Sequence, residues 1–279
     1  MQALVEAARA RDSVLVAGID PVPARFPPGL RDLPEADATL RFCTGILEAV
    51  EPYAAAVKLQ AAFFERLGPA GMEVYRALIA ASEELALPVI ADVKRGDIGP
   101  VAAAYAEAHL GVYGAACVTV NPYMGEDAVL PFLEEARGQE RGGGVFVLVA
   151  TSNPSSGDLQ QSTDPPLFES AARLVARLGE RNGDYPDAGA VVGVTRPEVG
   201  ARVREILPDT LFLSPGYGAQ GGDASSVRSL LGRNGGGVLV NSSRSILYAY
   251  ETSTADYKTA AREAARRTRD ELDLVGARL

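Results

Sequence analysis

The sequence has few of the residues that bind metals or form disulfides. It contains two cysteines, Cys43 and Cys117, and one histidine, His109. Two cysteines are too few for a disulfide framework or a cysteine-rich zinc site, and a reducing cytoplasm is the compartment that fits them best. One histidine cannot build a Ser-His-Asp triad or a multi-histidine metal site, and we expect His109 to cap a helix or to lie at the surface.

Long apolar runs and export signals are also missing. No apolar stretch approaches ~18 residues, the length that a membrane-spanning helix needs. The N-terminal stretch MQALVEAARARDSVLVAGID lacks the order of basic, apolar and small residues that marks a signal peptide. We therefore expect a cytoplasmic protein without a membrane span. The formal net charge of -9 disfavours a general surface for nucleic acid or anionic membranes, but it permits a local basic pocket for one phosphate.

The chain does have an ordinary globular balance, with 47% hydrophobic and 23% charged residues. Eight short runs of about strand length recur along it, and each is continuously apolar, as is typical of parallel strands buried on both faces. They are SVLVAGID (13–20), AAAVKLQ (54–60), PVIADVK (88–94), AACVTVN (115–121), GVFVLVAT (144–151), AGAVVGVT (188–195), TLFLSP (210–215) and GGVLVNSS (236–243).

Segments with helical spacing of apolar residues lie between these runs, and they include 71–86, 100–110, 126–138, 165–180 and 196–209. Eight strands alternate with helices, and no Gly-x-Gly-x-x-Gly motif follows the first strand. The pattern therefore predicts an α/β fold of the (β/α)8 TIM barrel type and not a doubly wound dinucleotide-binding sheet. We expect one domain over residues 1–279, with flanking helices at 2–11 and 254–275 that cover the barrel ends and a long loop at 151–166.

Polar residues close most of the apolar runs. Active sites of this barrel lie at the C-terminal ends of the strands, so these residues are the first candidates for a site. They are Asp20, Lys58, Asp92, Lys94, Asn121, Ser152, Pro215, and Ser243 with Arg244. Asn121 precedes a proline, and a turn explains it without a catalytic role.

The stretch ADVKRGDIG places two carboxylates around one lysine. Residues two apart on a strand face the same side, so Asp92 and Lys94 both enter the barrel mouth, and Asp97 follows in the loop. Taken alone, this pattern favours a salt bridge at a strand end. Lys58, at the end of another strand, extends it to a network of alternating charge. A lysine in such a network keeps its proton and suits charge stabilisation and proton donation more than nucleophilic attack.

Two later motifs predict a phosphate site. VLVNSSRSI (238–246) ends a strand and opens a helix, so its backbone N–H groups and Arg244 would form a phosphate cradle. An arginine on an ordinary helical turn is the competing interpretation. LSPGYGAQGGD (213–223) follows the seventh strand, and its glycines and Gln220 suit either a loop that closes over a ligand or a plain connector.

Together these motifs resemble the orotidine 5'-phosphate decarboxylase family. The resemblance rests on GIDP, VKLQ, ADVKRGDIG, TSNP, SPGYGAQGGD and NSSRSI, which follow strands one, two, three, five, seven and eight in this order. It covers nearly the whole chain and is greatest to the longer bacterial branch of the family. It implies a homodimeric barrel that converts orotidine 5'-phosphate to UMP and CO2 in de novo pyrimidine biosynthesis, without a cofactor or a metal.

The resemblance also implies a role for each matching residue. Lys94 would protonate C6 as CO2 leaves, within a charged network that includes Asp92, Lys58 and Asp97. Asp97 and Ile98 would come from the partner subunit. The residues implied to contact the substrate are Asp20 and Lys58 at the ribose hydroxyls, Ser152 at the pyrimidine edge, Gln220, Ser243 and Arg244 at the base and phosphate, and Pro215 and Ile98 in the pocket wall. Where the family usually has a threonine that contacts a ribose hydroxyl, this chain has Val101, which predicts a weaker affinity for the nucleotide.

Two other functions are compatible with the motifs. A phosphosugar decarboxylase or aldolase on the same barrel would need Mg²⁺ to stabilise an enediolate. A nucleotide-binding protein without turnover would need only the phosphate cradle, and the complete set of Asp92, Lys94 and Asp97 disfavours it because a binding protein need not keep these residues.

Overall fold

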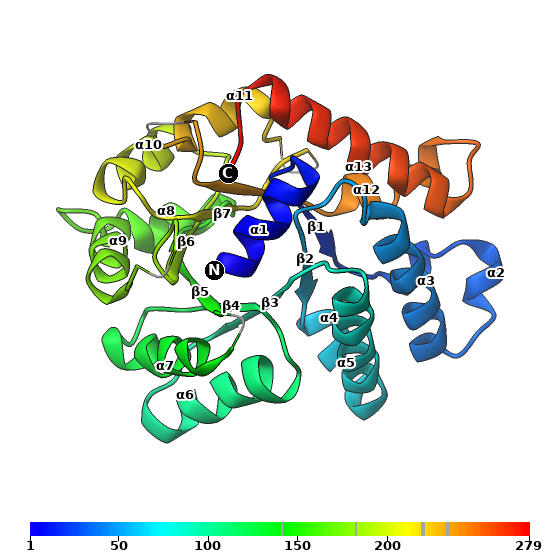
Figure 1. The fold of residues 1–279 in the computed structure, drawn as a ribbon, viewed down its shortest axis with the longest axis horizontal. Helices are drawn as coiled ribbons and strands as arrows, with labels where there is room; N and C mark the ends of the chain where they lie inside the picture. Colours follow the sequence, from blue (N-terminus) through cyan, green and yellow to red (C-terminus); the bar gives the residue numbers. More distant parts are fainter. Residues whose placement is uncertain (141, 182, 219–220, 233–234) are drawn as a thin grey trace.

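The fold is a closed barrel of parallel strands. The computed structural model describes residues 1–140, 142–181, 183–218, 221–232 and 235–279. Each strand pairs with the next in chain order, and β8 pairs with β1 (Figure 1). The strands are β1 (Leu15–Ile19), β2 (Ala56–Gln60), β3 (Val89–Arg95), β4 (Cys117–Val120), β5 (Gly144–Ala150), β6 (Ala188–Val192), β7 (Phe212–Ser214) and β8 (Val238–Ser242). The predicted (β/α)8 barrel is confirmed.

A ring of helices surrounds the barrel, and each connection between strands contains at least one of them (Figure 1). The longer helices of the ring are α3 (Glu35–Val50), α5 (Gly68–Glu84), α6 (Gly99–Ala106), α7 (Leu130–Gly138), α9 (Leu167–Leu178), α10 (Pro197–Ile206) and α13 (Tyr257–Leu274). The shorter ones are α2 (Pro28–Arg31), α4 (Ala62–Glu65), α8 (Gly157–Gln160), α11 (Ala224–Val227) and α12 (Arg244–Leu247). None of the described helices is long and apolar enough to cross a membrane.

The apolar residues of the strands supply two cores. Inside the barrel, Val16, Ile90, Phe146 and Leu239 belong to one buried cluster. Outside the barrel, the alternate strand residues pack against the helices in a second, larger cluster. Because successive side chains point to opposite faces, a strand in this position is buried on both sides, which explains why the predicted runs are apolar throughout.

The helix α1 (Gln2–Arg11) closes the N-terminal end of the barrel. Leu4 and Val5 are fully buried in the cluster inside the barrel. The ammonium group of Met1 donates to the carbonyl oxygens of Gly142 and Gly143, just before β5, at 2.8 Å each. Figure 1 shows α1 lying across the middle of the ring. The prediction that residues 2–11 cover a barrel end is confirmed.

The helix α13 does not cover a barrel end, contrary to the prediction. It completes the ring on the side of the barrel, where it packs against α3, α12 and β1 (Figure 1). Its buried residues, among them Ala261 and Ala265, recur at helical spacing between exposed charged residues. Gly45 leaves room for the side chains of α13 against α3, because a Cβ there would lie 2.3 Å from the hydroxyl oxygen of Tyr257. Mixed charge indicates an exposed face, but it does not distinguish the side of a barrel from its end.

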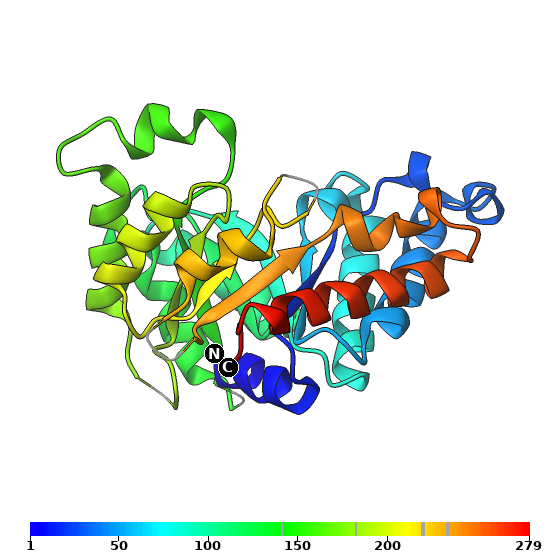
Figure 2. The ribbon, with the colours of Figure 1, turned by 90° about the horizontal axis from the view of Figure 1, so that it is seen from above.

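Residues 151–166 were predicted to be a long loop, but they contain two short helical turns. These are a 3-10 turn at Pro154–Ser156 and the helix α8, and the segment projects beyond β5 (Figure 2). The amide of Gln160 binds back to Thr151: Nε2 donates to Oγ1 at 2.7 Å, and Oε1 accepts from the backbone N–H at 3.1 Å. Polar contacts of this kind order a segment without an apolar run, so its composition indicated only a loop.

His109 is buried, and the prediction of a capping or surface position is wrong. The residue lies in a π-helical turn, Glu107–Val112, that continues α6. Its imidazole is 3% exposed and packs against the rings of Tyr75 and Tyr113, with Nδ1 3.4 Å from the Tyr75 hydroxyl. Burial, together with the nearby charge of Arg95, lowers the pKa of His109 to about 4.

We predict that this buried imidazole makes the stability of the fold depend on pH. A histidine in an unfolded chain binds a proton below about pH 6.5, whereas His109 in the folded protein does so only below about 4. Between these values the unfolded state binds more protons, so the free energy of unfolding falls as the pH is lowered. From about pH 7.5 to about pH 5, the wild type should lose about 2 kcal/mol more than His109→Gln.

Denaturant unfolding of the two proteins across this pH range measures the difference. Because the chain has a single histidine, NMR of the imidazole can assign the cause directly. An imidazole that titrates near pH 6.5 in the folded protein would contradict the prediction.

Candidate functional site

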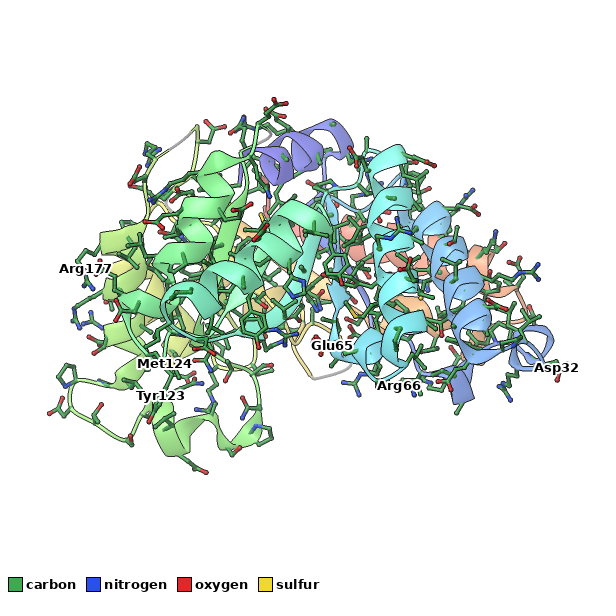
Figure 3. All side chains as sticks on the ribbon, turned by 90° about the horizontal axis from the view of Figure 1, so that it is seen from below. Asp32, Glu65, Arg66, Tyr123, Met124 and Arg177 are labelled. Carbon is green, nitrogen blue, oxygen red and sulfur yellow. The ribbon has the colours of Figure 1, made fainter. Side chains whose placement is uncertain are left out.

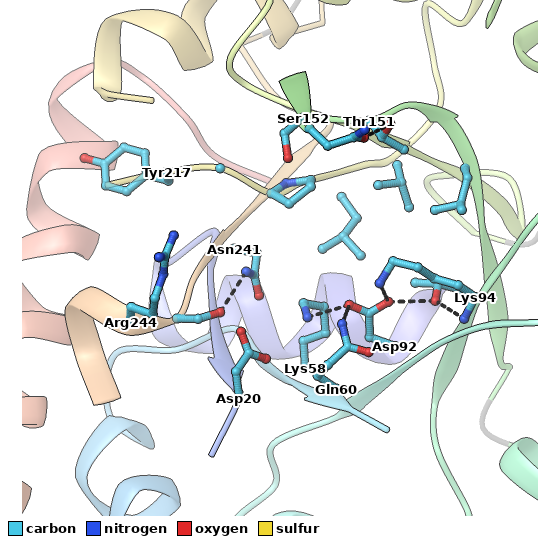
Figure 4. A pocket seen from close by; sticks show the side chains of 18 residues that line it. Asp20, Lys58, Gln60, Asp92, Lys94, Thr151, Ser152, Tyr217, Asn241 and Arg244 are labelled. Carbon is cyan, nitrogen blue, oxygen red and sulfur yellow. Dashed lines mark hydrogen bonds and ion pairs between the residues drawn. The ribbon is translucent and has the colours of Figure 1, made fainter. Parts of the chain in front are cut away.

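A cavity of about 370 Å³ opens at the C-terminal ends of the strands (Figure 4). Residues in or directly after all eight strands line it. The barrel therefore brings together side chains that are far apart in the sequence. The predicted site residues that line this cavity are Asp20, Lys58, Asp92, Lys94, Ser152, Pro215, Ser243 and Arg244.

The carboxylate of Asp92 accepts hydrogen bonds from four donors. Its Oδ2 accepts from Nζ of Lys58 at 2.7 Å and from Nε2 of Gln60 at 3.1 Å. Its Oδ1 accepts from Nζ of Lys94 at 2.5 Å and from Oγ1 of Thr119 at 2.9 Å. Figure 4 shows Asp92 with Lys58, Gln60 and Lys94 gathered at one end of the cavity. Four donors match the acceptor capacity of a carboxylate, so both its orientation and its charge are fixed.

Burial and ion pairing have opposite effects on the protonation of this cluster. Asp92 and Lys58 are each 5% exposed. Desolvation acts to raise the pKa of Asp92, but the attraction of Lys58 and Lys94 outweighs it and holds the pKa well below its usual range. Desolvation acts to lower the pKa of Lys58, but the carboxylates of Asp92 and Asp20 raise it above its ordinary value. Asp92 and Lys58 are therefore both ionised at neutral pH.

The backbone of Lys94 adopts the left-handed conformation, with a φ of 48°. This conformation is unfavourable for a residue with a Cβ, and it coincides with a shift in register between β3 and β4 after Ala91. The amide N–H of Lys94 donates to Oγ1 of Thr119 at 3.0 Å, and the same hydroxyl donates to Asp92. Thr119 therefore stabilises the irregular strand end that turns the Lys94 ammonium towards Asp92.

Ser243 and Arg244 line the other end of the cavity, directly after β8. The helix that they open, α12, has only four residues. Gly18 of β1 leaves room for this turn, because a Cβ there would lie 1.9 Å from Oγ of Ser243. In Figure 4, Arg244 lies on one side of the cavity and the Asp92 cluster on the other. The cavity therefore has a cationic side chain at each end.

The remaining predicted residues are placed differently. Ser152 lies in the cavity wall, and the hydroxyl of Thr195 donates to its carbonyl oxygen at 3.4 Å. Gln220 lies outside the residues that the structure describes. Asp97 and Ile98 do not line the cavity of their own chain: Asp97 accepts a hydrogen bond from the backbone N–H of Ile98 at 2.8 Å, and Ile98 is 50% exposed.

Asn121 forms a turn, as the sequence predicted. Its Oδ1 accepts from the backbone N–H of Tyr123 at 3.0 Å, and the residue does not line the cavity. Gly96 packs closely against it, because a Cβ at Gly96 would lie 3.1 Å from the Asn121 carbonyl oxygen. Asn121 thus holds the loop after β4 against the loop after β3.

Six polar residues that line the cavity were not among the predicted site residues: Gln60, Thr119, Thr151, Asn153, Tyr217 and Asn241. For Gln60 and Asn241 the available signal was the alternation of strand residues, since Gln60 lies two positions from Lys58 and Asn241 two positions from Ser243. Among the residues that the structure describes, no group of three or more histidine, cysteine, aspartate or glutamate side chains is placed to hold a metal ion.

Comparisons with known proteins point to one family. The model of the "Orotidine 5'-phosphate decarboxylase / HUMPS family" matches residues 31–259. The chain is 43% identical over 275 residues to the orotidine 5'-phosphate decarboxylase of Deinococcus radiodurans, covering 98% of this chain and 96% of the relative. It is 42% identical over 279 residues to that of Aromatoleum aromaticum, covering 98% of both chains. The structure of the Leishmania donovani OMP decarboxylase is similar with a TM-score of 0.82 and 33% identity, covering 99% of this chain and 97% of the other.

We predict that Asp92→Asn lowers the free energy of unfolding by about 3 kcal/mol, because it leaves Lys58 buried without its main anionic partner. A matched control is available because the chain has only three lysines. The third, Lys258, pairs with Glu48 at 2.7 Å, and both side chains are about half exposed. Glu48→Gln should therefore cost less than about 0.5 kcal/mol.

Urea unfolding of the two variants and the wild type measures both values. The double variant Asp92→Leu with Lys58→Met should recover much of the loss, since it removes both charges of the buried pair together. If Asp92→Asn were no more destabilising than Glu48→Gln, the buried pair would not have the energetic role assigned to it.

Proposed function

The chain belongs to the orotidine 5'-phosphate decarboxylase family and catalyses the conversion of orotidine 5'-phosphate to UMP and CO2 in pyrimidine biosynthesis, and we propose that it does so without a cofactor, with Lys94 as the proton donor. The observation that carries this proposal is the position of the Lys94 ammonium, which lies in the cavity wall 2.5 Å from the carboxylate of Asp92.

The chemistry requires a positive charge at the reacting carbon. When the bond between C6 and the carboxylate breaks, CO2 leaves and the electron pair remains on C6, which has no adjacent group to delocalise it. A preorganised ammonium stabilises this charge as it develops and then transfers its proton to C6. Lys94 is left as a neutral amine and takes a proton from water before the next turnover.

Asp92 has a positioning and an electrostatic role in this scheme. Its pKa lies well below its usual range and its oxygens are occupied by four donors, so it does not compete with C6 for the proton of Lys94. Lys58 balances the charge of Asp92 from the other side. The carboxylate of Asp92 thus orients the Lys94 ammonium without taking its proton.

The substrate would lie along the cavity between its two cationic ends. We assign the phosphate to Ser243 and Arg244, because a guanidinium binds phosphate in a charge-assisted and often bidentate way. Asp20 and Lys58 would bind the ribose hydroxyls, and Ser152 and Pro215 would contact the pyrimidine. Binding of the distant phosphate would hold C6 next to Lys94, so that binding energy is used at the reacting carbon. We keep Gln220 as a proposed contact to the base and phosphate.

We further propose that the chain acts as a homodimer in which Asp97 and Ile98 reach the cavity of the partner subunit. An exposed apolar surface beside the cavity supports this. It consists of Ile98 directly before α6, Val101 and Tyr105 within α6, and Tyr123 and Met124 in the loop after β4, the last two labelled in Figure 3. Exposed apolar surfaces of this kind are typical of protein interfaces. Val101 would then lie in the interface, where it cannot supply a hydrogen bond to ribose.

Two broader predictions remain part of the proposal. We propose that residues 1–279 act as one catalytic barrel domain, since helices from both ends of the chain pack on the same barrel. We also propose the cytoplasm as its compartment, and the two cysteines, Cys43 and Cys117, support this because both are buried and unbonded to each other.

We predict that Lys94→Ala lowers kcat for orotidine 5'-phosphate by about 10⁴-fold, because it removes both the positive charge and the proton donor. Binding of UMP, measured by calorimetry, should change much less, since the lysine acts mainly where charge develops. Lys258→Ala, which removes the surface lysine, should leave kcat unchanged. Substantial turnover by Lys94→Ala would refute the assigned role.

We predict that subunit exchange restores activity between two inactive variants. If Asp97 acts in the partner's site, Lys94→Ala and Asp97→Ala homodimers are both nearly inactive. A mixed dimer then has one site with both residues intact and one site with neither. An equal mixture should regain about a quarter of the wild-type activity, because half of the dimers are mixed and each has one intact site.

Each variant exchanged with itself is the control, and native mass spectrometry can confirm that mixed dimers form. If Asp97 serves its own chain, every site of the mixed dimer carries one lesion. Mixed dimers without any gain in turnover would therefore exclude the shared site.

A further inference from the structure

Asn241 is a polar residue near the end of β8, and its side chain points into the barrel mouth. Leu239, two positions earlier on β8, belongs to the cluster inside the barrel, and alternation places Asn241 on the same face. Asn241 is 6% exposed and lines the cavity. A buried amide is unfavourable unless its polar atoms are hydrogen-bonded. The hydrogen bonds of Asn241 therefore indicate why an amide is present at this position.

One polar atom of Asn241 has no partner in the part of the chain that the structure describes. Nδ2 donates to Oγ of Ser243 at 3.2 Å, but Oδ1 is buried and receives no hydrogen bond. Oδ1 of Asp20, in the same cavity, is also buried without a donor. Two unpaired acceptors in one cavity match a ligand that carries two hydrogen-bond donors.

The backbone holds the Asn241 amide in place. Asn241 pairs in register with Val16 of β1, and Gly18 follows two residues later on that strand. A Cβ at Gly18 would lie 2.9 Å from Oδ1 of Asn241 and 1.9 Å from Oγ of Ser243. The missing side chain therefore provides the space that both groups fill. The position of the Asn241 amide is therefore fixed by packing against Gly18, and the amide does not extend into solvent.

The place of Asn241 along the cavity indicates which part of the ligand it meets. In Figure 4, Asn241 and Asp20 lie between Arg244 at one end and the cluster of Lys58, Asp92 and Lys94 at the other. On the proposed function, the phosphate occupies the first end and the reacting carbon the second. The group between a nucleotide's phosphate and its base is the ribose, and its two hydroxyls are hydrogen-bond donors.

We propose that Asn241 binds a ribose hydroxyl beside Asp20 and thereby selects ribonucleotides over deoxynucleotides. This inference rests on the proposed function and adds to it a specificity-determining residue. Because a hydroxyl both donates and accepts, the match holds for either orientation of the Asn241 amide. A site built to bind a hydroxyl rejects an analogue without it, because the polar group of the protein is then left unpaired.

The test compares three substrates: orotidine 5'-phosphate and its 2'-deoxy and 3'-deoxy analogues. In Asn241→Leu, which keeps the approximate shape but not the polar atoms, kcat/KM for the parent substrate should fall about 10-fold. For the analogue that lacks the contacted hydroxyl, kcat/KM should change less than about 2-fold. The preference for the parent over that analogue should therefore fall about 5-fold or more.

Arg244→Ala provides the contrast, because all three substrates carry the phosphate and should lose kcat/KM by a similar factor. If Asn241→Leu lowers kcat/KM equally for all three substrates, or for none of them, Asn241 does not contact a ribose hydroxyl and the inference is wrong. Asn241→Ala gives the same comparison if the leucine variant does not fold. A wild type that turns over none of the three would instead refute the proposed function, so the two failures are distinguishable.

Discussion

The carboxylate of Asp92 determines the arrangement of the barrel mouth. It lies on β3 and accepts hydrogen bonds from Lys58 and Gln60 of β2, from Lys94 of its own strand and from Thr119 of β4. Three neighbouring strands must therefore end in the register that brings these donors together. The buried carboxylate of Asp92 and the buried ammonium of Lys58 require each other, because either one alone would be buried without compensation. The left-handed backbone of Lys94 is stabilised within this network by the hydroxyl of Thr119.

The cavity holds a charged cluster in one part and unpaired hydrogen-bond acceptors in another. At one end of the cavity, the carboxylate of Asp92 already has four donors before any ligand binds. The middle of the cavity is incomplete: the buried oxygens of Asp20 and Asn241 have no donors among the described residues. Preorganised charge stabilises a transition state, whereas unpaired acceptors favour a ligand that supplies hydroxyl groups. The proposed roles in catalysis and in substrate recognition therefore fall in different segments of one cavity, with Arg244 at its far end.

The strands could be predicted from the sequence because a strand buried on both faces is apolar throughout. Most of the residues that were predicted from the ends of those strands do line the cavity. The helix α3 was not among the predicted segments. It contains Gly45, which weakens the helix propensity of the segment but leaves room for the side chains of α13. This contact between two helices cannot be read from the local sequence. The π-helical turn that buries His109 and the left-handed backbone of Lys94 likewise depend on neighbouring elements. Gln60 and Thr119 were overlooked because a polar residue on a strand does not show which partner it will have.

If the protein's own charges are sufficient for decarboxylation, the purified chain should turn over orotidine 5'-phosphate at an undiminished rate after exhaustive treatment with EDTA. UMP should form in stoichiometric yield, with one deuterium at C6 when the reaction runs in D2O. Loss of turnover on chelation, with recovery on addition of Mg²⁺, would contradict this prediction and would favour the metal-dependent chemistry found on related barrels.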